Sequence, residues 1–167
     1  MSDTLRRPLT HLFLDLEDTI ITPAIGGFAK TQLINVEKIQ NFIQLTQPDT
    51  LNIFSFAIYD DTCLANFFNT YTDKMIEKSL GMNLINIPTV QNMIDIFTHH
   101  MRIGIGTVDI SDFFQMVGKQ TAFRHFVKRK SSNNLNDTFI LVDDVVEWEE
   151  FQFPGAKGIV RNVDNDL

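Results

Sequence analysis

Apolar residues along this chain fall into two kinds of pattern, one typical of strands and one of helices. Short continuous apolar runs predict β-strands that are buried on both faces, and they lie at residues 11–16, 51–58 and 138–144. Apolar positions at helical spacing, or helix start and stop signals, predict helices at 33–47, 61–80, 88–101 and 119–130. Two more short strands are expected, at 112–117 and within 155–163.

Buried strands that are separated by helices indicate the α/β class. We expect a three-layer α/β/α domain with a Rossmann-like parallel sheet that helices cover on both sides. A chain of 167 residues fits one domain, over residues 1–167, with room for a small helical insertion within 82–110. One turn and one helix occupy residues 20–50, so no sizeable cap domain is expected there.

Composition narrows the class of protein. The formal net charge is −7, which argues against a protein that grips a nucleic-acid backbone with Lys and Arg. The single cysteine, Cys63, cannot form an intrachain disulfide and is expected to be a small buried apolar residue. No apolar run has the length of a signal peptide or a membrane span. We therefore expect a cytoplasmic protein with no membrane partner.

Acidic and hydroxyl side chains stand at the ends of the three buried strands. The first strand runs into Asp15 and Glu17, the second reaches Ser55, and the third ends in Asp143 and Asp144. In parallel sheets, ligand sites lie outside the carboxyl ends of the strands, so these side chains should converge there. Such an all-oxygen set suits Mg²⁺. The alternative is that the first group is only an acidic, solvated turn.

The order of these pieces resembles the haloacid dehalogenase superfamily. The resemblance covers residues 11–144 and consists of an Asp15-Leu16-Glu17-Asp18-Thr19 motif after the first strand, a serine at the second, a helix-leading lysine, and an aspartate pair after the last strand. A phospho-receiver domain uses similar residues, but there the acid pair comes first in the chain. The order seen here favours the dehalogenase-like interpretation, in its capless form.

The resemblance implies a magnesium-dependent phosphatase that acts through an aspartyl-phosphate. It assigns Asp15 as the nucleophile and Glu17 as the general acid/base. The phosphate ligands would be Ser55, Lys119 and Thr19. Mg²⁺ would be held among Asp15, Glu17, Asp143 and Asp144, with Asp143 preferred within the pair. A site without a lid is open to a bulky phosphorylated substrate, such as a nucleotide, a nucleic-acid end or a phosphoprotein.

One residue departs from the usual pattern of the superfamily. Most of its phosphatases carry Asp two residues after the nucleophile, whereas this chain carries Glu17, as the enolase-phosphatase branch does. The longer side chain must fold back to reach the same leaving oxygen. A catalytically silent relative, which keeps the fold and serves as a binding or regulatory module, is therefore the alternative to an active phosphatase.

Overall fold

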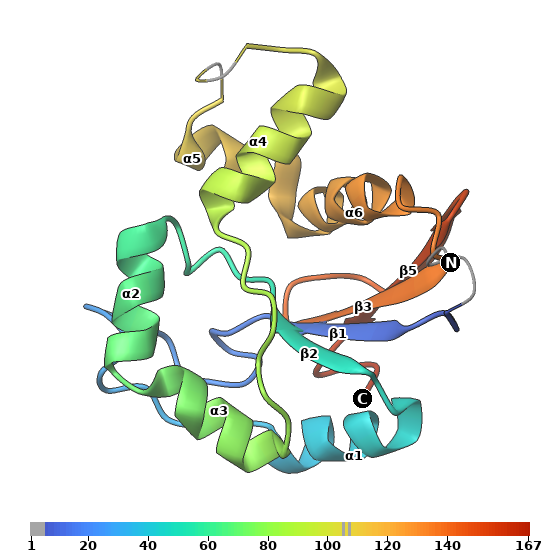
Figure 1. Cartoon of the computed structure of the whole chain (residues 1–167). Coiled ribbons are helices and arrows are strands. Elements are labelled where there is room, and N and C mark those ends of the chain that lie inside the picture. The colour runs from blue at the N-terminus through green and yellow to red at the C-terminus, as the bar shows by residue number, and fades with distance from the viewer. Residues whose placement is uncertain (1–5, 105, 107) are drawn as a thin grey trace.

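A computed structural model describes residues 6–104, 106 and 108–167, and its architecture is α/β (Figure 1). A single five-stranded sheet has the strand order β2-β1-β3-β5-β4. The strands are β1 (Thr10–Leu14), β2 (Thr50–Ile53), β3 (Asp137–Asp143), β4 (Glu149–Phe153) and β5 (Ala156–Asn162). The expected strands at 11–16, 138–144 and 155–163 are confirmed. The strand expected at 51–58 stops at Ile53, so Ser55 lies in the turn that follows it.

Four of the five strands are parallel, and their register aligns their carboxyl ends. Leu14 of β1 pairs with Ile53 of β2 on one side and with Val142 of β3 on the other. The residues that follow these three positions therefore leave the sheet at the same edge. This alignment places Asp15 beside the end of β3.

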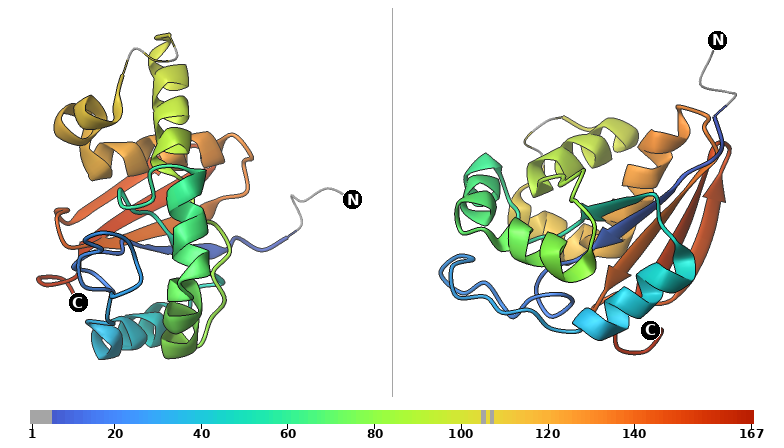
Figure 2. Two further views of the ribbon diagram at one scale, coloured as in Figure 1. Left: turned by 90° about the vertical axis from the view of Figure 1, so that its left-hand side faces the viewer. Right: turned by 60° about the horizontal axis from the view of Figure 1, so that its bottom comes forward.

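Helices cover both faces of the sheet (Figure 2). They are α1 (Val36–Thr46), α2 (Asp61–Asn69), α3 (Thr72–Leu80), α4 (Val90–Met101), the short α5 (Ile110–Asp112), the π-helical turn η2 (Phe113–Val117) and α6 (Gly118–Ser131). Successive β1 side chains point to opposite faces. Leu12 and Leu14 thus join a core with α1 and α3, while Phe13 joins a second core with α4 and α6. No helix among the described residues has the length and apolar character to cross a bilayer.

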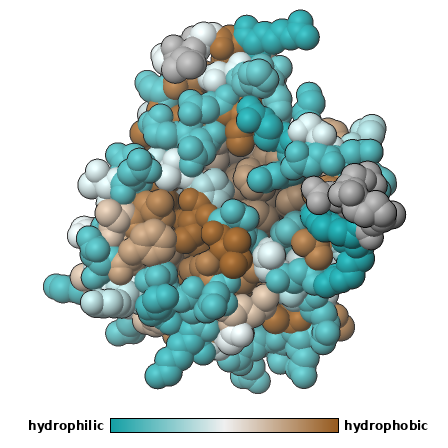
Figure 3. Space-filling model, viewed as in Figure 1, coloured by the Kyte–Doolittle hydropathy of each residue, from teal (hydrophilic) through white to brown (hydrophobic). Residues whose placement is uncertain are grey.

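The helix expected over 61–80 is two helices. The backbone at Tyr71 takes a left-handed conformation, with φ of +58°, which ends α2 and starts α3 in a new direction. The segment 82–88 that follows α3 then runs along the edge strand β2, where the Ile85 amide donates to the Leu51 carbonyl at 2.9 Å. Apolar side chains gather between α2–α3 and the sheet on this otherwise largely hydrophilic face (Figure 3).

The prediction of a strand at 112–117 is wrong. The run forms the end of α5 and the π-helical turn η2, which continues into α6 at Gly118, where φ is +79°. Its exposure pattern explains the error, because Phe113 is buried against the α4–α6 core whereas Met116 is 82% exposed. A short apolar run that is buried on one side only can be a helical turn as readily as a strand.

The sheet is mixed, whereas the sequence predicted a parallel sheet. β4, which sequence patterns did not indicate, pairs antiparallel with β5 through a tight hairpin at Pro154 and Gly155. Gly155 has φ of +96°, and a Cβ there would lie 2.5 Å from the Ser131 carbonyl oxygen, so the turn requires glycine. The hairpin lies on the far side of β3 and does not alter the edge where Asp15 emerges.

Candidate functional site

Three carboxylates meet where β1 and β3 end. Asp15, Asp143 and Asp144 each offer an oxygen, and these oxygens lie within 4.8 Å of one another. The parallel register dictates this meeting, because Asp15 follows Leu14 and its amide donates to the Val142 carbonyl at 3.0 Å. The prediction that these side chains converge at the strand ends is therefore confirmed.

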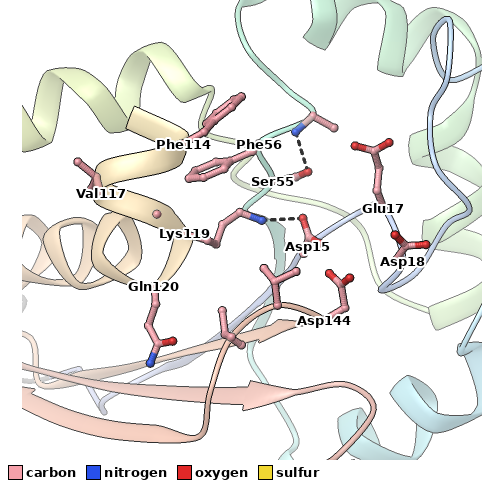
Figure 4. A pocket seen from close by; sticks show the side chains of 14 residues that line it. Asp15, Glu17, Asp18, Ser55, Phe56, Phe114, Val117, Lys119, Gln120 and Asp144 are labelled. Atoms are coloured by element: carbon pink, nitrogen blue, oxygen red, sulfur yellow. Dashed lines mark hydrogen bonds and ion pairs between the residues drawn. The ribbon is translucent and has the colours of Figure 1, made fainter. Parts of the chain in front are cut away.

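Lys119 lies beside Asp15 at this edge of the sheet (Figure 4). It stands in the first turn of α6, and its Nζ donates to Asp15 Oδ1 and to Asp143 Oδ2, each at 2.8 Å. Burial opposes the charge of this ammonium, but the two carboxylates outweigh burial, so the pKa of Lys119 lies above its ordinary value. One fixed positive charge thus faces three carboxylates, two of which it binds directly.

Asp15 is almost fully enclosed. Burial raises the pKa of its carboxyl group, Lys119 acts in the opposite direction, and the negative charge of Asp143 raises the pKa further. The Thr19 hydroxyl lies 3.3 Å from Asp15 Oδ2 and 3.5 Å from Asp144 Oδ1, so Thr19 stands between the two acids. The first turn after β1 therefore contributes both an acid and a hydroxyl to the site.

Asp143 and Asp144 occupy different environments. Asp143 is fully buried, with Oδ2 on Lys119 and Oδ1 accepting from the Val145 amide at 2.9 Å. Asp144 lines the open cavity beside Asp15. Burial, together with the charges of Asp143 and Asp15, raises the pKa of Asp144 to about 7. Of the pair, Asp144 is the acid that a ligand in the cavity can reach.

The raised pKa of Asp144 predicts a pH-dependent stability. Between about pH 4 and pH 7 the folded protein holds a proton that the unfolded chain has released, so this group lowers stability as pH rises through that window. Asp144→Asn should therefore be more stable than wild type at pH 8 by about 1 kcal/mol, allowing for partial solvent exposure, and by less than half as much at pH 5. Thermal unfolding in a metal chelator at both pH values measures this. An equal difference at both would contradict it.

Glu17 does not join the three-carboxylate group. Its Oε2 accepts a hydrogen bond from the Ala24 amide at 2.7 Å. Ala24 belongs to residues 22–28, an irregular segment over the carboxyl edge that we call the flap. Glu17 still lines the cavity next to Asp15, but the flap holds its carboxylate to one side. Ser55 also lines the cavity, and its Oγ accepts from the Ala57 amide at 3.1 Å, which leaves its proton available to a ligand.

The cavity has a volume of about 510 Å³. Its polar side includes Asp15, Ser55, Lys119 and Asp144 besides Glu17, Asp18 and Gln120, and Phe56, Phe114 and Val117 supply an apolar wall. Lys119 Nζ lies 4.8 Å from the centre of the Phe56 ring, which in turn stacks on Phe114 at 4.6 Å between ring centres. The cavity can thus hold a compact anion at Lys119 with an organic group beside it.

Sequence reasoning missed the aromatic wall. Phe56 directly follows Ser55, and its place in the chain was the one available signal. Phe114 belongs to the run at 112–117 whose strand assignment was wrong, so its orientation toward the site had no sequence signature. Comparisons of the chain with protein-family models, with curated proteins and with solved structures found no match.

Proposed function

We propose that this protein is a magnesium-dependent phosphohydrolase of the haloacid dehalogenase type, with Asp15 as the nucleophile. The observation that carries the proposal is that Asp15, Lys119 and the Asp143–Asp144 pair, which are far apart in the sequence, meet at the carboxyl edge of the sheet. An ammonium and a carboxylate beside an open cavity are the groups that a phosphoryl transfer to aspartate needs.

The donor set fits Mg²⁺. All candidate ligands are carboxylate oxygens, and three of them face a single ammonium, which leaves an excess of negative charge. Burial raises the pKa of Asp144, the negative charges of Asp143 and Asp15 raise it further, and a divalent cation would relieve that repulsion. Asp15 and Asp144 would hold the ion, with Asp143 and Glu17 close to them. When bound, Mg²⁺ would supply the positive charge that offsets repulsion between a carboxylate and a phosphate dianion.

The residues of the chain divide the reaction between them. A carboxylate oxygen of Asp15 attacks phosphorus, and the bond from phosphorus to the alcohol oxygen breaks as Glu17 gives that oxygen a proton. Glu17 then takes a proton from water, whose oxygen attacks phosphorus and releases phosphate from Asp15. Throughout, Lys119 and Ser55 bind phosphate oxygens, whereas Thr19, which the resemblance also offered as a phosphate ligand, is fully buried outside the cavity and holds the Asp15 carboxylate through its hydroxyl. Lys119 provides fixed positive charge at the place where negative charge is transferred.

The second candidate function is a silent binding module of the same fold. The observation that favours it is the hydrogen bond between Glu17 and the Ala24 amide, which holds the acid away from the three-carboxylate group. A phosphoryl ligand could then bind at Lys119 without turnover.

Release of nitrophenol from p-nitrophenyl phosphate distinguishes the two functions. We expect turnover by the wild-type protein with Mg²⁺ and none in the presence of a chelator. Absence of turnover under both conditions, with the protein folded, would favour the binding module.

Replacing Glu17 tests the general acid directly. Glu17→Gln keeps the size of the side chain and its hydrogen bond to Ala24, but it cannot release a proton, so the rate should fall by roughly 100- to 10,000-fold. Glu17→Asp is the informative companion, because it shortens the side chain by one methylene. If Glu17→Asp is faster than wild type, the native side chain is misplaced and the silent module is the better description.

A further inference from the structure

A second cavity adjoins the candidate site on the other side of Glu17. Its volume is about 440 Å³, and it lies between the flap and the N-terminal half of α2. Glu17 and Ala57 line both cavities, so the two meet at the side chain of the general acid. No sequence pattern indicated this second cavity, because the flap has no regular secondary structure.

The position of Glu17 determines where the alcohol part of a substrate lies, if the proposed function holds. The phosphoryl group must lie at Asp15 and Lys119, and the leaving oxygen must contact the acid that protonates it. Beyond that oxygen, the rest of the alcohol continues past Glu17. The space that continues past Glu17 is the second cavity.

The charge of this cavity selects against anionic alcohols. Among the described residues that line it there is no Lys, Arg or His that could pair with an anion. Two carboxylates, Asp60 and Asp61, stand at the start of α2. The positive end of that helix is already neutralised, because Asp60 accepts from the Cys63 amide at 3.0 Å. A second phosphate or a carboxylate on the alcohol would therefore be repelled without a partner.

The remaining polar groups of the cavity suit neutral hydroxyls. Tyr59 and Thr62 carry hydroxyls, and Asn66 Oδ1 accepts from the Phe28 amide at 3.0 Å, which turns the amide nitrogen of Asn66 toward other partners. Gly27 keeps the flap close to this residue, since a Cβ there would lie 3.2 Å from Asn66 Oδ1. Neutral donors and an aromatic ring can hold a hydroxyl-bearing organic group without charge.

We infer that this second cavity binds the alcohol part of the substrate, and that this alcohol is compact, uncharged and hydroxyl-bearing. The inference rests on the proposed function for the place of the phosphoryl group. It narrows the open range of bulky substrates to phosphomonoesters of small neutral alcohols, and it selects against phosphorylated nucleic-acid ends, which carry further phosphates.

Cys63 provides a test that needs no turnover. Cys63 is the sole cysteine of the chain, and it lines the second cavity. Its side chain is half-buried, whereas the sequence analysis expected it to be fully buried. Alkylation by iodoacetamide, which is uncharged, therefore reports on this cavity alone. With Mg²⁺ and the unreactive Asp15→Asn protein, adenosine 5′-monophosphate should slow alkylation at least fivefold. Inorganic phosphate and adenosine 3′,5′-bisphosphate should not, and adenosine should protect the wild-type protein.

A charge-reversal experiment supplies the second test. Thr62→Lys places a cation in the cavity and should raise kcat/KM for the bisphosphate relative to the monophosphate at least tenfold. Gln44→Lys, on the exposed face of α1, changes net charge equally and should leave the ratio unchanged. Equal protection of Cys63 by both nucleotides, or protection by neither, overturns the inference. If the monophosphate protects Cys63 but the wild-type protein does not hydrolyse it, the proposed function is refuted and the cavity assignment stays intact.

Discussion

Lys119→Met should destabilise the protein by about 3–5 kcal/mol and remove phosphatase activity. Lys119, Asp15 and Asp143 are each at least nine-tenths buried, and the ammonium contacts both carboxylates at 2.8 Å. Methionine matches the length of the side chain and leaves two acids enclosed without a cation. The cost arises from those uncompensated charges and not from lost packing.

The effect of Lys119→Met should depend on pH. In the wild type, the raised pKa of Lys119 keeps the ammonium charged, so its contribution is fully present at neutral pH and is lost only as pH rises above its ordinary value of 10.5. In the variant, the two acids can lower their cost by taking up protons, and burial already raises the pKa of Asp15. The difference from wild type should therefore be smaller at pH 5 than at pH 8.

Urea unfolding at both pH values measures these differences. Lys128→Met is the matched control, because Lys128 is exposed near the end of the same helix and should change stability by no more than about 0.5 kcal/mol. If Lys119→Met is as stable as this control at pH 8, the ammonium does not lie between the two carboxylates.

The sequence predicted the acids of the site well because their positions follow from strand geometry. A continuous apolar run fixes where a buried parallel strand ends, and parallel strands end at one edge, so Asp15 and Asp143 had to converge. The helix that starts at Lys119 was predicted from its pattern, and α6 confirms it with bounds one residue wider at each end, whereas only the family resemblance implied that Lys119 belongs to the site. The inferences about the two acids needed only local patterns and one rule about sheets.

The features that the sequence did not reveal depend on tertiary contacts. The direction of Glu17 is fixed by the amide of Ala24, seven residues later in an irregular flap. The break at Tyr71 depends on a left-handed backbone at a residue that rarely adopts one. β4 alternates polar and apolar residues over only its last four positions, and its pairing with β5 makes it a strand. Patterns of period two or 3.6 carry little information about such elements.

Asp15→Asn should reduce phosphatase activity by more than about 1,000-fold while leaving the fold intact. Asparagine has the same shape as aspartate, but its amide oxygen is a poor nucleophile toward phosphorus. Lys119 keeps Asp143 as a charged partner, so the variant should lose no more than about 2 kcal/mol of stability. This result would distinguish it from Lys119→Met, which should lose both activity and a larger part of its stability.

Asp18→Asn is the matched control for Asp15→Asn. Asp18 is an exposed member of the same acidic motif, and its φ of +62° is a conformation that asparagine adopts readily. This variant removes the same charge three residues away and should retain most of the wild-type rate. A loss equal to that of Asp15→Asn would show that overall negative charge, and not one nucleophile, determines the rate.

Incorporation of phosphate into the protein identifies the nucleophile independently of turnover. Wild-type protein given Mg²⁺ and acetyl phosphate should acquire a label that hydroxylamine removes, as expected for an acyl phosphate, and Asp15→Asn should acquire none. A labelled wild type with little nitrophenol release would place the defect in the hydrolytic half of the reaction, where Glu17 acts on water. Equal labelling of both proteins would mean that the phosphoryl group is transferred to a residue other than Asp15, and the mechanism would have to be abandoned.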